Sequence, residues 1–133
     1  MSLPLPAILL VEDEPIVAMD MADCITDAGY QVVGPVATLP DAIRIGRDGM
    51  FDAALVDANL AGAKVDEVAA VLTERGIPFA FVTGYARETL PEAFRHVPVI
   101  AKPYEHEQLK QIVRSLLART NSLGTVPFKR SVV

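Results

Sequence analysis

The sequence predicts an α/β fold, a doubly wound (βα)5 arrangement in which five parallel strands alternate with five helices. Two observations predict it: short apolar runs recur along the chain, and a longer amphipathic segment follows each run. Several runs are continuously apolar, as strands buried on both faces of a sheet must be. The chain has 133 residues, 51% of them hydrophobic, which suits one domain with a substantial core.

The predicted strands are short and rich in aliphatic residues. The second strand contains Gly34 and Pro35, which disfavour the centre of a sheet and favour an edge position. The third ends in Asp57 and the fourth in Thr83, so polar groups close runs that are otherwise apolar. The predicted strands span residues 7–11, 31–37, 51–57, 78–83 and 97–101.

The predicted helices are marked by residues that suit their ends. Pro15 fits the first position of a helix, and Gly29 fits the position just after its last turn. Thr38 is a typical N-cap before the second helix, whereas Pro91 weakens the fourth. The predicted helices span residues 15–28, 39–47, 64–75, 87–95 and 105–119.

Beyond Arg119 the hydrophobic periodicity stops. We therefore expect one domain over residues 1–119 and a tail or linker stub over residues 120–133. This stub is too short for a DNA-binding output domain. The chain reads either as a stand-alone protein or as one module cut from a longer regulator.

The amino-acid composition argues against several classes of function. The net charge is −5 and no basic stripe occurs, which argues against direct binding to nucleic acid. Cys24 is the single cysteine, so no intramolecular disulfide can form, and a reducing compartment is expected. No apolar run approaches the ~20 residues of a membrane span, and no basic n-region opens the chain. We expect a cytoplasmic protein without membrane contact.

Polar and charged side chains gather where the predicted strands end. Three neighbouring carboxylates would repel one another, and a divalent cation relieves that repulsion. Ligation by carboxylate oxygens predicts Mg²⁺, with Mn²⁺ as an alternative. Because the carboxyl ends of parallel strands share one edge, we expect these groups to converge: Glu12, Asp13, Asp57, Thr83 and Lys102.

This set of residues suits phosphoryl transfer. A metal and a lysine neutralise developing charge, and a hydroxyl donates to a phosphoryl oxygen. Asp57 can act as the nucleophile and form an aspartyl phosphate. Glu14, which precedes Pro15, is assigned a different role: its charge favours the positive end of the following helix, and it is not predicted to bind the metal.

Glu12-Asp13, Asp57, Thr83 and Lys102-Pro103, in this order and spacing, resemble the receiver domain of two-component response regulators. The resemblance covers residues 7–118. It implies a flavodoxin-like fold whose five-stranded parallel sheet has the order 2-1-3-4-5.

The resemblance implies a role for each residue of the acidic group. Asp57 corresponds to the phosphoacceptor, and Asp13 to a direct ligand of the metal. Glu12 corresponds to an acid that holds the metal mainly through water. The backbone carbonyl of Asn59, two residues after Asp57, would complete the metal shell.

The same resemblance implies roles at the ends of the last two strands. Thr83 corresponds to the hydroxyl that moves onto the phosphoryl group, and Lys102 to the lysine that pairs with it. The Lys102–Pro103 peptide bond is expected to be cis, a minority state for a residue before proline.

The sequence departs from the common receiver pattern in its switch residues. Val99 stands where most receivers carry an aromatic residue, and Gly84 follows Thr83 where Ala or Ser is common. The segment PFAFVTGYA resembles an alphaproteobacterial single-domain subfamily with the pattern Pro-Phe-x-Phe-Ala-Thr-Gly, whose partners are kinases of the HWE or HisKA2 type. We expect switching by ordering of the loop after Thr83. Tyr85 either tunes the phosphoryl group or is an exposed loop residue.

The resemblance implies a phosphorylatable receiver. It would accept a phosphoryl group on Asp57 from a sensor histidine kinase or a phosphotransfer protein, and signal to an unknown protein partner through protein–protein contacts. It would not be an enzyme, although it would catalyse its own phosphorylation and dephosphorylation.

One alternative is a Mg²⁺-dependent phosphatase with an aspartate nucleophile, which usually has a second Asp where Asn59 stands. A flavodoxin-like cofactor binder is another, but the acidic EDEP segment would repel a phosphate.

Overall fold

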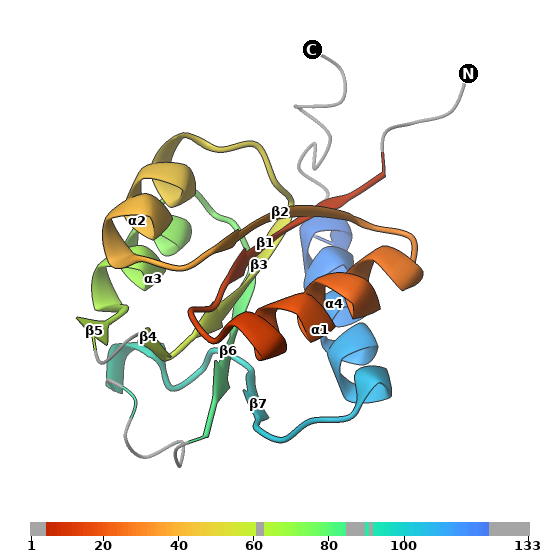
Figure 1. Cartoon of the computed structure of the whole chain (residues 1–133). Coiled ribbons are helices and arrows are strands. Elements are labelled where there is room, and N and C mark those ends of the chain that lie inside the picture. The colour runs from red at the N-terminus through yellow and green to blue at the C-terminus, as the bar shows by residue number, and fades with distance from the viewer. Residues whose placement is uncertain (1–4, 61–62, 85–89, 91, 123–133) are drawn as a thin grey trace.

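The computed structural model describes residues 5–60, 63–84, 90 and 92–122, with residues 63–64 and 120–122 described by their backbone alone. Its centre is a parallel five-stranded sheet of order β2-β1-β3-β6-β7 (Figure 1). In chain order this is the predicted 2-1-3-4-5 arrangement, which is confirmed. The sheet consists of β1 (Ala7–Val11), β2 (Gln31–Val36), β3 (Ala53–Asp57), β6 (Phe79–Thr83) and β7 (Val99–Ala101).

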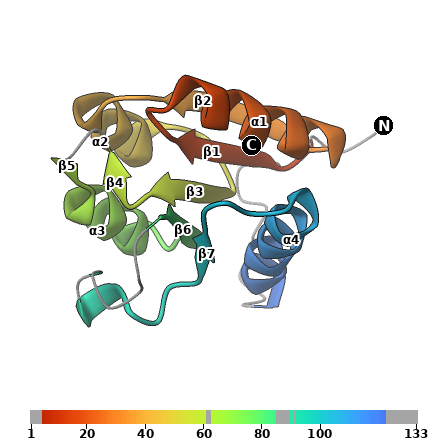
Figure 2. The same cartoon turned by 60° about the horizontal axis from the view of Figure 1, so that its bottom comes forward.

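Helices cover both faces of the sheet (Figures 1 and 2). One face carries α1 (Pro15–Asp27) and α4 (His106–Ser122), and the other carries α2 (Leu39–Asp48) and α3 (Asp66–Glu74). Within the described part of the chain, no helix is both long enough and apolar enough to cross a membrane.

The strands have apolar side chains on both faces because both faces are covered. In β1, Leu9 and Val11 pack against the α2–α3 side, while Ile8 and Leu10 pack against the α1–α4 side. All four are fully buried. Successive side chains of a strand point to opposite faces, so one strand supplies two separate cores. Burying each such side chain stabilises the fold by about 1.5–3 kcal/mol.

The residues predicted to start and end the first helix, and to cap the second, are confirmed. Pro15 occupies the first turn of α1, and Gly29 follows its end with a positive φ of 96°. The Thr38 hydroxyl accepts a 3.4 Å hydrogen bond from the Asp41 backbone N–H as the N-cap of α2. Cys24 is buried in the core on the inner side of α1.

The structure differs from the prediction on the connections around β3 and β6. A small antiparallel hairpin, β4 (Asn59–Leu60) and β5 (Ala63–Lys64), precedes α3, so the third helix begins at Asp66 and not at residue 64. Strands of two residues are too short for a periodic signal.

The fourth predicted helix falls partly outside the described residues, since 85–89 and 91 are not among them. Its described part is the single 3-10 turn η2 (Glu92–Phe94). At the other end of the domain, α4 runs to Ser122 and so continues past the predicted boundary at Arg119.

The edge strand β2 is irregular, and this irregularity is tied to the end of β1. The register between the two strands shifts between Leu9 and Val11. Gly34 has a φ of 101°, and a β-carbon there would lie 2.9 Å from Leu10 O. After the shift, Val36 O accepts a 2.9 Å hydrogen bond from the backbone N–H of Glu12. Gly34 thus permits the backbone path that holds Glu12 at the sheet edge.

Replacing Gly34 with alanine should lower the free energy of unfolding more than replacing Gly29. Both residues have positive φ, which costs an alanine about 1–2 kcal/mol. At Gly34 the new methyl group would also meet backbone atoms at 2.8–2.9 Å, whereas at Gly29 none of the described atoms beyond its chain neighbours lies within 4 Å. Urea denaturation of the two variants measures the difference. Equal losses for Gly34→Ala and Gly29→Ala would contradict the close approach.

Candidate functional site

The carboxyl ends of the parallel strands bring distant acids to one place. Glu12 and Asp13 follow β1, and Asp57 is the last residue of the neighbouring strand β3. One carboxylate oxygen from each of the three lies within 4.8 Å of the others. Glu12 and Asp57 are buried, with 1% and 5% of their surfaces exposed. The structure therefore brings together the three acids that the sequence predicts as metal ligands.

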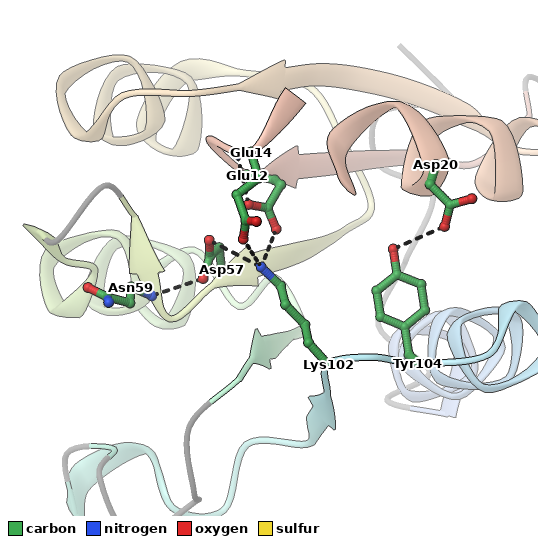
Figure 3. Close-up of polar contacts among 7 residues, drawn as sticks. All are labelled: Glu12, Glu14, Asp20, Asp57, Asn59, Lys102 and Tyr104. Atoms are coloured by element: carbon green, nitrogen blue, oxygen red, sulfur yellow. Dashed lines mark hydrogen bonds and ion pairs between the residues drawn. The ribbon is translucent and has the colours of Figure 1, made fainter. Parts of the chain in front are cut away.

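Lys102, just after β7, is the cation of this acidic group. Its Nζ lies 3.0 Å from Glu12 Oε1, 2.9 Å from Glu14 Oε1 and 3.6 Å from Asp57 Oδ2 (Figure 3). Burial lowers the pKa of the Lys102 amine, but the contacts with Glu14 and Glu12 and the charge of Asp57 outweigh burial and raise it. Lys102 is therefore held as an ammonium ion.

Glu12 is the most constrained of the acids. Burial raises the pKa of Glu12 to about 7, against the opposing effects of the Glu14 backbone N–H and the Lys102 amine. The Glu14 N–H donates to Oε2 at 3.1 Å. Oε1 is buried and pairs with Lys102 by charge at 3.0 Å, but within the described part of the chain no donor is directed at it as in a hydrogen bond. One buried carboxylate oxygen is thus only partly satisfied.

This donor set fits a hard divalent cation. Three carboxylates face a single ammonium group, so negative charge remains in excess. The donors in the cluster are oxygens, as Mg²⁺ requires, and the buried Glu12 Oε1 lacks a directed donor. Among the described residues, no cysteine or histidine belongs to the cluster. Glu12, Asp13 and Asp57 are the residues that could hold such an ion.

Asp57 is oriented by the backbone that follows it. The N–H of Asn59 donates to Asp57 Oδ1 at 3.0 Å, which leaves Oδ2 on the side of Lys102. Asn59 begins the β4–β5 hairpin. The predicted part of its carbonyl in a metal shell stays a prediction.

Thr83 and Lys102 are neighbours across the edge of the sheet. Thr83, the last residue of β6, has 1% of its surface exposed, and its carbonyl accepts a 2.8 Å hydrogen bond from the Lys102 N–H. The Lys102–Pro103 peptide bond is cis.

The remaining predicted switch positions lie around the same strand ends. Val99 pairs in register with Phe81 and packs, partly buried, against the α2–α3 core. Gly84 is exposed, and no atom of the described residues beyond its chain neighbours lies within 4 Å of the place where its β-carbon would stand. Tyr85 lies outside the described residues. The roles assigned to these positions stay predictions.

Sequence reasoning missed the part played by Glu14. It precedes α1, as predicted, but its side chain makes no capping hydrogen bond to that helix and instead pairs with Lys102. These two residues are 88 positions apart. No local pattern signals such a contact, although a lysine expected among acids at the strand ends could have suggested it.

A second polar group joins α1 to the segment after Lys102. The Tyr104 hydroxyl donates to Asp20 Oδ2 at 3.5 Å (Figure 3), and His106 Nε2 lies 2.8 Å from Asp20 Oδ1. Burial, together with the charge of Asp20, raises the pKa of the Tyr104 hydroxyl. Tyr104 therefore stays protonated and can keep donating. Sequence periodicity gave no sign of this contact.

The comparisons with curated proteins place this architecture among regulators. The chain is 30% identical over 117 residues to the phyllosphere-induced regulator PhyR of Methylorubrum extorquens, a match that covers 83% of this chain and 43% of PhyR. It is 22% identical over 116 residues to the transcriptional regulatory protein PdtaR of Mycobacterium tuberculosis, covering 84% of this chain and 57% of PdtaR. The chain spans about half the length of these curated relatives.

Solved structures include a relative of nearly equal length. SdrG from Sphingomonas melonis is 39% identical, with a TM-score of 0.75, and the match covers 88% of this chain and 99% of SdrG. The BeF3-activated conformation of SdrG matches at 38% identity and a TM-score of 0.72, with the same coverage.

The family model for the response regulator receiver domain matches residues 8–114. This span contains every residue of the acidic group and Lys102. Receiver domains are signalling domains, and they bind Mg²⁺ at an acidic pocket. The chain belongs to the receiver domain family of two-component response regulators.

Proposed function

We propose that Asp57 is the phosphoacceptor and that phosphorylation requires Mg²⁺. The observation that carries this is the convergence of three carboxylates and one lysine at the sheet edge, with Asp57 Oδ2 3.6 Å from Lys102 Nζ. Asp13 and Asp57 would hold the ion directly, and Glu12 would hold it through water. The backbone carbonyl of Asn59 would be a further ligand. Mn²⁺ would serve in place of Mg²⁺ because it takes the same oxygen ligands.

Each residue of the site has a separate task in phosphoryl transfer. Asp57 attacks phosphorus through a carboxylate oxygen, and the bond from phosphorus to the donor breaks. Lys102 neutralises charge on the phosphoryl oxygens, and the Thr83 hydroxyl donates to one of them. When bound, Mg²⁺ would add charge neutralisation. The chain thereby catalyses its own phosphorylation and, with water as the acceptor, its own dephosphorylation.

The phosphoryl donor in the cell would be a sensor histidine kinase, of the HWE or HisKA2 type, or a phosphotransfer protein. Receiver domains interact with such partners. The start of α1, one residue after Glu14, offers an apolar contact beside the site, because Ile16 and Met19 have 83% and 66% of their surfaces exposed. A donor protein seated there would bring its phosphohistidine next to Asp57.

The output would be a protein–protein contact in the cytoplasm, without direct binding to nucleic acid or membrane.

Because Val99 stands where most receivers carry an aromatic residue, the signal would pass through the loop after Thr83, where Gly84 leaves the backbone unhindered. Tyr85 would tune the lifetime of the phosphoryl group. Residues 1–119 would form the receiver, whose last helix continues to Ser122, and the rest of residues 120–133 would form a tail or linker. A phosphatase is disfavoured because the position two residues after the nucleophile holds Asn59, which cannot serve as an acid.

Incubation with acetyl phosphate and Mg²⁺ should add one phosphoryl group, seen as a mass gain by intact-protein mass spectrometry. Asp57→Asn should abolish the gain because an amide does not attack phosphorus. Asp23→Asn is the control, since Asp23 is an exposed acid on α1 away from the strand ends. Persistent labelling of Asp57→Asn would show that another residue is the acceptor.

Mg²⁺ affinity should fall about tenfold or more in Asp13→Asn, because an amide oxygen lacks the charge that a hard cation needs. Isothermal titration calorimetry measures the dissociation constant without any phosphoryl donor. Asp23→Asn again controls for the loss of one surface charge. If Asp13→Asn bound Mg²⁺ as tightly as the unmodified protein, Asp13 would not be a ligand.

A further inference from the structure

The Lys102 amine lies nearer to the acids that follow β1 than to Asp57. Nζ donates a 2.9 Å hydrogen bond to Glu14 Oε1 and lies 3.0 Å from Glu12 Oε1, against 3.6 Å to Asp57 Oδ2. Figure 3 shows the Lys102 side chain reaching toward all three carboxylates. An ammonium group has three donors. Since one ammonium charge is shared among three carboxylates, a phosphoryl group on Asp57 would compete with Glu12 and Glu14 for the Lys102 amine.

Glu14 is the contact most easily given up. Its side chain is 59% exposed, whereas that of Glu12 is fully buried and cannot turn into water. The Glu14 backbone is fixed, because its N–H donates to Glu12 Oε2 at 3.1 Å. Its side chain makes no cap for α1. The Glu14 carboxylate is therefore a solvent-facing partner that can release Lys102 into water.

Given the proposed phosphorylation of Asp57, we propose that Glu14 is a positioning residue that competes with the phosphoryl group for the Lys102 amine. When an Asp57 oxygen attacks phosphorus, the bond from phosphorus to the donor atom breaks (nitrogen in phosphohistidine, oxygen in acetyl phosphate), and the leaving group keeps the electron pair. The phosphoryl oxygens then accept a hydrogen bond from Lys102 in place of Glu14. No proton is transferred at Glu14. Glu14 thereby slows the phosphorylation of Asp57.

The effect should be moderate. An exposed ion pair changes an equilibrium constant by roughly two- to fivefold. Glu14→Gln keeps the length of the side chain and removes its charge, so it should speed labelling of Asp57 by that factor. Glu107→Gln is the matched control, because Glu107 is likewise an exposed acid that pairs with a cation, Arg114 at 3.2 Å, but on α4.

Labelling by acetyl phosphate with Mg²⁺ tests the competition. We expect Glu14→Gln to be labelled about threefold faster than the unmodified protein, and Glu107→Gln at the unmodified rate. In a Lys102→Met background, Glu14→Gln should no longer have an effect, since the two residues act through one contact. Equal rates for Glu14→Gln and the unmodified protein, or the same gain without Lys102, would overturn the proposal.

The reactivity of Lys102 tests the pairing without any phosphoryl donor or lysine variant. Reductive methylation, read by peptide mass spectrometry, should modify Lys102 faster in Glu14→Gln, with Lys110 as an internal reference. Unchanged Lys102 reactivity would overturn the inference by itself. If the unmodified protein took no label on Asp57, the proposed function would fail and this inference with it. Normal labelling that is indifferent to Glu14→Gln would refute the inference alone.

Discussion

The site depends on one imbalance of charge: a single ammonium group forms ion pairs with several carboxylates at the edge of a buried sheet. Lys102 lies within 3.6 Å of an oxygen of Glu12, Glu14 and Asp57, and Asp13 adds a further acid to the same cluster. Like charges at this spacing are unfavourable unless cations share them. The lysine satisfies part of that need within the chain. What remains unsatisfied, chiefly at Glu12 Oε1, is the chemical basis for attracting a metal ion.

The fold maintains this arrangement by filling two cores from the same strands. The apolar side chains of β1, β3 and β6 alternate between the α1–α4 side and the α2–α3 side, so the central strands are fixed from both directions. Their ends can then carry charged groups without disturbing the packing. The edge strand β2 contributes through its irregular backbone at Gly34, which lets Val36 O accept from the Glu12 N–H. A polar site of this kind is positioned by hydrophobic packing and by backbone geometry together.

Sequence patterns predicted the larger part of the fold. Unbroken apolar runs identified the central strands, Gly34 and Pro35 identified the edge strand, and the order of polar residues at the strand ends identified the acidic cluster. Sequence patterns did not predict features that leave no periodic signal along the chain. The β4–β5 hairpin is too short to leave one, and the bond between Glu14 and Lys102 joins residues 88 positions apart. The neighbour Pro15 suggests a helix-start role for Glu14, whereas the partner of Glu14 is Lys102, which follows the edge strand β7.

The contact between Tyr104 and Asp20 has an optical consequence. The chain has three tyrosines and no tryptophan, so indole emission cannot hide phenol emission. A phenol that donates to a carboxylate emits weakly, because its excited state passes a proton to the acceptor. Tyr104 donates to Asp20 and lies two residues after Lys102. A change in tyrosine fluorescence would therefore indicate, without an attached dye, whether α1 and the segment that carries Lys102 remain in contact.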